Sequence, residues 1–178
     1  MKMKRFVSLL LAAFMVLALA GCSSLGLGST DSDEPKLDGY LGDTLSTYWF
    51  DFTVNDAYLC DEYEGYTPAD GYRMLVVSLS LKSTVSFSVS MFQSDFPILW
   101  AEGDSSDGDW PIYAFTDEQL PDEYSLGINQ SKSGLLVYEV PEDKKDFSLA
   151  FMEVFEDEDN EDGREGETYF VDFTPTEK

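Results

Sequence analysis

The sequence contains no histidine, and it has only 11 lysine and arginine residues against 35 aspartate and glutamate residues. The absence of histidine removes the side chain most used for acid–base catalysis near neutral pH, and it excludes Ser-His-Asp and Cys-His nucleophile pairs. Any metal site must then be built from oxygen ligands, which favours calcium or magnesium over zinc or copper. The net charge of -24 repels phosphates, so we expect no nucleic-acid binding.

The many carboxylates carry little evidence for an enzyme. Paired acids could perform glycosidase chemistry, but among 35 acidic residues adjacent pairs are unavoidable. The 178 residues fit one domain, and a hydrophobic fraction of 43% is enough for a core. A domain of this size leaves little room for a deep substrate cleft. We therefore expect a protein that is not an enzyme and that holds no cofactor.

The beginning of the chain has the charge order of a secretory signal peptide. A basic segment at residues 2–5 precedes residues 6–20, which are uncharged, mostly apolar and too few for a typical membrane span. The run ends in LAGC, where Gly21 precedes Cys22. This ending resembles the bacterial lipoprotein signal. The resemblance implies cleavage between Gly21 and Cys22 and a diacylglycerol group on the Cys22 sulfur.

The signal divides the chain into a leader at residues 1–21, a tether at residues 22–40 and a folded domain at residues 41–178. The tether is rich in serine, glycine and aspartate and has no hydrophobic period, which predicts a flexible segment. Two or more acyl chains, such as palmitate, anchor a protein stably. We therefore expect a lipid-anchored protein on the extracytoplasmic face of the membrane, at the bacterial cell surface. Without the leader, 8 basic and 35 acidic residues remain, and the net charge is -27.

Strand patterns dominate the remaining sequence. Apolar and polar residues alternate over residues 48–54, 75–82, 85–91 and 169–173, while residues 135–140 and 147–155 are the most apolar runs, typical of central strands. Shorter candidates are residues 96–100 and 110–115. No stretch after the leader keeps a convincing helical period. The pattern predicts an all-β, antiparallel, immunoglobulin-like sandwich of about seven to eight strands, with an up-and-down barrel as the alternative.

Two motifs carry a family resemblance. Residues 71–84 read GYRMLVVSLSLKST, and residues 134–141 read GLLVYEVP, in which we expect Gly134 to form a turn and Pro141 to end a strand. The pair resembles a group of Gram-positive bacterial lipoproteins with an immunoglobulin-like domain of unknown function, although Ser83 stands where asparagine or aspartate is more usual. That family is similar in fold to a mycobacterial secreted immunoprotective antigen. The resemblance covers residues 45–174 and transfers no catalytic or ligand residue.

Two acidic loops, at residues 102–109 and 156–167, are candidates for a weak calcium site, because calcium takes six to eight oxygen ligands. An EF-hand register starting at Glu158 fails, since Tyr169 stands where a bidentate glutamate belongs. Two interpretations stay open: solvated hairpin loops of an acidic protein, or a cation-dependent ligand site. The candidate metal ligands are Asp104, Asp107, Asp109, Asp159 and Asp162.

Aromatic residues are the other candidates. Trp100, Trp110 and Tyr113 flank the first acidic loop, and exposed aromatics beside carboxylates can bind sugars or proteins. Core packing, or pinning of the loop, is the other interpretation of these three residues. Six phenylalanines on strand periods are expected in the core: Phe50, Phe52, Phe87, Phe147, Phe151 and Phe173.

Cys60 is the remaining thiol once Cys22 carries a lipid, so no intramolecular disulfide is available. Neighbouring carboxylates disfavour its thiolate, and we expect a poor nucleophile that is half-buried or forms an intermolecular disulfide.

Taken together, the sequence predicts a non-catalytic surface module that binds a protein, a peptide or a cell-wall polymer. The alternative function is calcium- or cation-dependent ligand binding through the two acidic loops.

Overall fold

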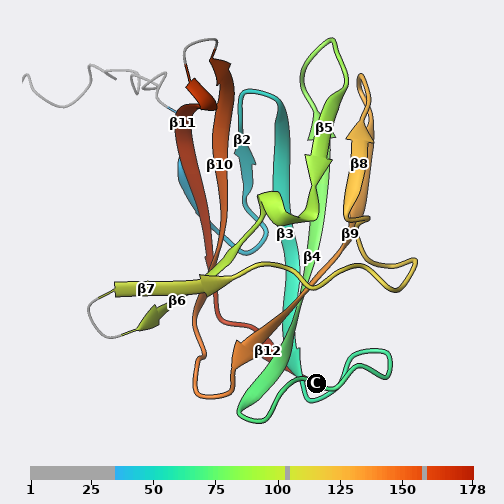
Figure 1. Ribbon diagram of the computed structural model, residues 1–178, viewed down its shortest axis with the longest axis vertical. Helices are drawn as coiled ribbons and strands as arrows, with labels where there is room; N and C mark the ends of the chain where they lie inside the picture. The colour runs from blue at the N-terminus through green and yellow to red at the C-terminus, as the bar shows by residue number, and fades with distance from the viewer. Residues whose placement is uncertain (1–34, 103–104, 158–159) are drawn as a thin grey trace, which may run out of the picture. The chain divides into compact units, whose positions relative to one another are not determined.

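The computed structural model describes residues 35–102, 105–157 and 160–178, which form an almost purely β structure (Figure 1). They contain one 3₁₀ turn, η1 (Gln93–Asp95), and none of their helical segments is long and apolar enough to cross a membrane. Twelve strands make up the rest of the regular structure: β1 (Asp38–Tyr40), β2 (Thr44–Ser46), β3 (Phe50–Cys60), β4 (Tyr72–Ser83), β5 (Val89–Phe92), β6 (Ile98–Glu102), β7 (Ser105–Asp109), β8 (Glu123–Leu126), β9 (Ser131–Pro141), β10 (Phe147–Asp157), β11 (Asn160–Phe173) and β12 (Thr176–Glu177).

The strands build a sandwich, which confirms the predicted all-β antiparallel class. One sheet has the order β1-β11-β10-β6-β7, the second has the order β12-β3-β4-β9 with β2 paired to β3, and β5 and β8 form a separate pair. Two short terminal strands depart from the antiparallel rule, because β1 pairs in parallel with β11 and β12 pairs in parallel with β3. Five short strands, β1, β2, β7, β8 and β12, have no counterpart among the predicted segments, so the structure has more strands than the predicted seven to eight.

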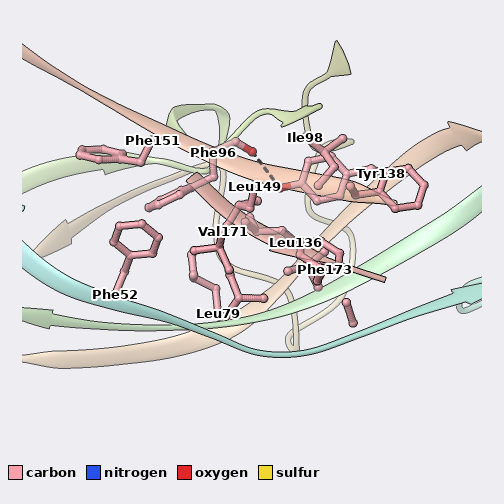
Figure 2. Packing of buried hydrophobic residues seen from close by; sticks show 14 of the residues in the cluster. Phe52, Leu79, Phe96, Ile98, Leu136, Tyr138, Leu149, Phe151, Val171 and Phe173 are labelled. Atoms are coloured by element: carbon pink, nitrogen blue, oxygen red, sulfur yellow. Dashed lines mark hydrogen bonds between the residues drawn. The ribbon is translucent and has the colours of Figure 1, made fainter. Parts of the chain in front are cut away.

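The core lies between the two sheets. Phe52 and Leu79 of one sheet face Phe151 and Val171 of the other, as Figure 2 shows. The rings of Phe50 and Phe151 have centroids 4.9 Å apart. Burial of such large apolar side chains from both sheets, at roughly 25 cal/mol per Å² of apolar surface, is the main force that holds the layers together.

Tyr138 of β9 is the largest fully buried side chain, and its hydroxyl still has a partner. It donates a 2.8 Å hydrogen bond to the carbonyl oxygen of Phe96, which follows η1 (Figure 2). Burial raises the pKa of Tyr138 well above its ordinary value. A buried hydroxyl without an acceptor would be costly, so this bond fixes the chain before β6 against the opposite sheet.

Two predicted strands were wrong. The alternating residues 85–91 contain a bend, and β5 begins only at Val89. Phe87, expected in the core, is therefore 49% exposed, whereas the other five core phenylalanines are buried. Residues 110–115 form no strand and run as an irregular segment.

The folded part also starts before the expected boundary at residue 40. β1 already pairs with β11 there, and the carbonyl oxygen of Leu37 accepts a hydrogen bond from Phe170 N.

Pro141 ends a strand as predicted, Gly71 marks another strand boundary, and Gly134 has a role other than the predicted turn. Gly71 has φ +85° and precedes β4, while Pro141 is the last residue of β9. Gly134 does not form a turn, because it lies inside β9 opposite Leu79. A Cβ at Gly134 would lie 3.0 Å from the Leu120 backbone nitrogen, so the close approach of residue 120 explains the glycine.

Candidate functional site

The irregular segment at residues 110–116 lies against the outer face of β4 and β9. Ile112 N donates a 2.8 Å hydrogen bond to Val137 O, and the Ile112 side chain packs on a small apolar cluster that includes Met74 and Val76. Leu75 and the other alternate residues of β4 face the main core instead. Both faces of β4 are therefore covered, which explains its continuous apolar sequence from residue 74 to residue 77.

Buried polar side chains hold this segment in place. Gln93 donates from Nε2 to Ile112 O at 3.1 Å and to Asp122 Oδ1 at 2.6 Å. The same Asp122 oxygen accepts a 2.8 Å bond from Ala114 N, and Gln119 Oε1 accepts a 3.0 Å bond from Phe115 N. These side-chain contacts replace the ladder that an irregular backbone lacks, so the segment has a defined shape.

The pinned segment forms one wall of a depression of about 720 Å³, which we call the aromatic depression. Its lining includes five partly exposed aromatic residues, two carboxylates and no lysine or arginine. Trp110 is 61% exposed and Tyr113 is 82% exposed. The aromatic members are Tyr66, Tyr72, Trp110, Tyr113 and Phe115, and the carboxylates are Asp109 and Glu139.

Glu139 holds the residues on the opposite side of the aromatic depression in place through hydrogen bonds. Its Oε1 accepts a 2.5 Å hydrogen bond from the Tyr66 hydroxyl, and its Oε2 accepts a 3.1 Å bond from Ala69 N. The bond to Glu139 raises the pKa of Tyr66. The ring of Tyr66 also lies 5.9 Å from that of Phe115, and Tyr63 meets the same Phe115 edge-on at 5.8 Å. The rings of Tyr66 and Phe115 are thus held in place by contacts within the protein.

The structure separates Trp100 from the two other predicted ligand-binding aromatics. Trp110 and Tyr113 share the aromatic depression, but Trp100 is 7% exposed and meets Phe147 edge-on at 6.5 Å. Its indole belongs to the main core and borders a different depression of about 700 Å³. Of the two interpretations left open, core packing is the one that Trp100 fits, because its strand β6 turns this side chain into the sandwich.

The two acidic loops do not meet in one site. β10 pairs with β6 at Ser148 and Leu149, near its beginning, and β6 runs from there away from the rest of β10. The β6–β7 hairpin and the β10–β11 hairpin therefore end at opposite ends of β10, about 30 Å apart at 3.3 Å per residue (Figure 1). The described strands that lead into the two loops therefore do not bring the loops together.

The individual carboxylates can be placed only in part. Asp107 and Asp109 lie on β7, opposite Trp100 and Ile98 of β6. Asp104 and Asp159 lie outside the described residues, and for Asp162 only the backbone is described. Within the described part of the chain, no three or more aspartate, glutamate and cysteine side chains gather in a way that could hold a metal ion.

Cys60 is half-buried at the end of β3, in the apolar cluster on the outer face of β4. Burial raises the pKa of its thiol, and the Asp61 carboxylate adds to this, while Arg73 acts in the opposite direction. The pKa of Cys60 is therefore raised, as expected. The larger cause is desolvation, and the neighbouring carboxylate contributes less.

Comparison with known proteins places the fold in a family. Residues 40–160 match the family described as a domain of unknown function (DUF4352). The chain belongs to this family. The predicted resemblance to proteins with a domain of unknown function is confirmed at that level, and no curated protein matches the sequence.

Three solved structures show the same fold as this DUF4352 chain. The yjhA protein from Bacillus subtilis is 18% identical, with a TM-score of 0.56 over 79% of this chain and 99% of its own. A predicted lipoprotein from Staphylococcus aureus is 11% identical, with a TM-score of 0.52 over 82% and 97%. The predicted lipoprotein ycdA from Bacillus subtilis is 20% identical, with a TM-score of 0.50 over 72% of this chain. The match spans 38% of the ycdA chain.

Sequence reasoning missed Glu139 and the contribution of Tyr66 and Tyr72 to the depression. Because successive strand residues point to opposite faces, Glu139 could have been placed on the outer face of β9, between Tyr138 and Val140, which point into the core. No local signal could have shown that the Tyr66 hydroxyl reaches Glu139, since 73 positions separate them.

Proposed function

We propose that the protein is a lipid-anchored, extracytoplasmic binding module of the bacterial surface, which carries an immunoglobulin-like sandwich and binds a cell-wall glycan without catalysis. The observation that supports this function is the aromatic depression. Tyr66, from the loop before β4, and Tyr72, the first residue of β4, come together there with three aromatics of the pinned segment, Trp110, Tyr113 and Phe115. An open, partly rigid set of aromatic side chains is a platform for a ligand with a flat apolar face.

The chemistry of the aromatic depression favours a neutral sugar polymer over an anionic one. The faces of sugar rings are apolar and stack on aromatic side chains, while carboxylates such as Asp109 and Glu139 can accept hydrogen bonds from sugar hydroxyls. The net charge of -27 after the leader repels anionic polymers. We therefore propose the uncharged glycan part of the wall as the ligand.

The anchor is supported by the sequence, with Cys22 as the lipidated residue and the membrane as the first partner. Two of the structurally similar proteins are themselves predicted lipoproteins, which agrees with this location. A binding role fits better than catalysis, because the chain has no histidine and burial raises the pKa of the Cys60 thiol.

The proposal is tested by sedimentation of the full chain, in detergent, with purified insoluble wall glycan from which anionic polymers have been stripped. The double variant Trp110→Ala/Tyr113→Ala should bind at least about tenfold more weakly than the unchanged protein, as expected when two stacking contacts are lost. Phe87→Ala is the matched control, because Phe87 is also an exposed aromatic but does not line the depression. Equal sedimentation of all three proteins would reject the glycan site.

A further inference from the structure

β10 is paired on both sides only near its beginning. Its β11 side is paired along the strand from Phe147 to Asp157, with two irregularities in the register. On its other side, β6 pairs with Ser148 and Leu149, and Ala150 N donates a 3.0 Å bond to Pro97 O. Among the described residues, no further strand pairs with this side of β10. The later part of β10 is therefore an open sheet edge.

The open edge presents backbone groups in a regular pattern. Because Ala150 N points toward β6 and strand residues alternate, the N–H and C=O groups of Met152 and Val154 point to the same side. The extra residue in the register at this place belongs to β11, since Met152 faces Thr168 and Val154 faces Glu165. β10 itself stays regular here, and its unpaired groups can receive another strand.

The side chains at this edge are unusual for an unprotected strand. Met152 is 43% exposed and Val154 is 44% exposed. Soluble proteins commonly protect sheet edges with lysine or proline, and the open part of β10 has neither. Its Glu153 is buried, so Glu156 is the exposed charge near the end of the edge.

A groove follows the open edge. Met152 and Val154 form one wall, and Val89 and Phe92 of β5 form the other, while Trp49 lines it as well. The groove has a volume of about 220 Å³, and β5 pairs with β8 on one side only among the described residues. β10 and β5 both stand upright in Figure 1. Residues of both strands thus line one largely apolar groove.

The floor of the groove is part of the packed core. The ring of Trp49 lies 4.9 Å from that of Phe155 and 6.4 Å from that of Phe151, which it meets edge-on. Phe151 itself is 5% exposed. A segment bound in the groove would therefore rest on fixed aromatic side chains and would not need to open the sandwich.

We propose that the open edge of β10 accepts an extended, basic segment of a partner protein, which adds to the sheet as a strand beside Met152 and Val154. The unpaired backbone groups select an extended chain, and the groove selects apolar side chains at alternate positions. The charge selects lysine or arginine at the other positions, since Asp95 lines the groove and Glu156 lies at its edge. A second copy is a poor occupant, because it would bring the same acidic edge and a net charge of -27.

This surface is separate from the aromatic depression, with which it shares no lining residue, so the two proposals can fail independently. The probe is a short synthetic peptide of alternating valine and lysine residues. The matched control peptide has the same net charge, but its central valine residues are replaced by proline, which cannot donate to a ladder. Binding is measured by calorimetry on the full chain in detergent, together with amide hydrogen exchange.

The alternating peptide should bind at least about tenfold more tightly than the proline control, as expected for the loss of several ladder bonds. It should slow exchange at Met152 and Val154 and leave Val76 of the doubly paired β4 unchanged. The variant Met152→Ser/Val154→Ser should weaken binding without changing the fold, since both side chains are partly exposed. Equal binding of both peptides, unchanged exchange at residues 152 and 154, or self-association of the chain through β10 would overturn the proposal.

Discussion

The backbone N–H of Tyr48 donates a 2.7 Å hydrogen bond to Oε1 of Glu153, across 105 positions of sequence. Glu153 is 4% exposed, and the same oxygen accepts a 3.1 Å bond from the Tyr169 hydroxyl. Its Oε2 accepts a longer 3.4 Å bond from Glu167 N. One buried carboxylate therefore ties the turn before β3 to β10 and β11, and so connects the two sheets.

Glu153→Ala should lower the free energy of unfolding by about 3 kcal/mol, because it leaves the buried Tyr169 hydroxyl and the partly buried Tyr48 N–H without an acceptor. Glu153→Gln keeps an acceptor oxygen and should cost less than half as much. Urea unfolding followed by tryptophan fluorescence measures both. Glu156→Gln, an exposed acid of the same strand, is the control, and an equal effect of this variant would show that the connection has no energetic role.

Tyr169 predicts a specific loss of stability at alkaline pH. Burial, and next the charge of Glu153, raise the pKa of Tyr169 to about 12, whereas an unfolded tyrosine titrates near 10. The folded state thus favours the neutral hydroxyl, and its stabilisation is complete below pH 10 and lost as the pH rises to 12. The difference in unfolding free energy between the unchanged protein and Tyr169→Phe should shrink over this range. A constant difference would contradict the prediction.

Trp100 and Trp110 should respond in opposite ways to the same substitution. Trp100→Ala empties a core position and should cost about 3 to 5 kcal/mol in unfolding free energy. Trp110→Ala removes an exposed ring and should change it by less than about 0.5 kcal/mol. Thermal or urea unfolding distinguishes them directly. A large loss for Trp110→Ala would mean that its ring supports the pinned segment and is not free for a ligand.

The Cys60 thiol should react slowly with a disulfide reagent such as Ellman's reagent. Burial raises its pKa and lowers the thiolate fraction near pH 8, and access is also restricted because the residue is half-buried. The measurement uses a Cys22→Ser variant, so that one thiol remains. Unfolding in urea should increase the rate at the same pH, and equal rates in both states would show that the fold does not protect this residue.

The sequence predicted those strands that can be recognised from the pattern of apolar residues within one segment. Residues 135–140 and 147–155 were recognised as strands because they are continuously apolar, and they correspond to β9 and β10. The expected central position is wrong for β9, which is the last strand in the order β12-β3-β4-β9. The alternation over residues 85–91 misled because the chain there leaves β4 and enters β5, with a bend at Phe87 that neither glycine nor proline marks. Alternation reports the spacing of apolar residues, and it cannot report where a chain passes from one layer to the next.

Only part of the candidate site could be predicted from the sequence, because its residues come from segments that are far apart in the chain. Trp110 and Tyr113 could be recognised as aromatics in a polar region, and both are exposed. Their partners in the aromatic depression, Tyr66 and Glu139, come from other parts of the chain and meet only through the pairing of β4 with β9 and the hydrogen bonds of Gln93. The open edge of β10 likewise depends on where the pairing with β6 ends, which no single segment encodes.

The parallel pairing of β1 with β11 determines how the domain responds to a force applied at its amino-terminal side. A pull on the chain from its amino-terminal side loads three paired residues of β1 first, long before it reaches the core. If β1 detaches, residues 36–44 are released as far as the fully buried Leu45, and their extended length of about 30 Å is the upper limit of the gain. Under such a force β1 would detach and pair again with β11 when the force ends. The sandwich, with the aromatic depression and the groove beside β10, would stay folded.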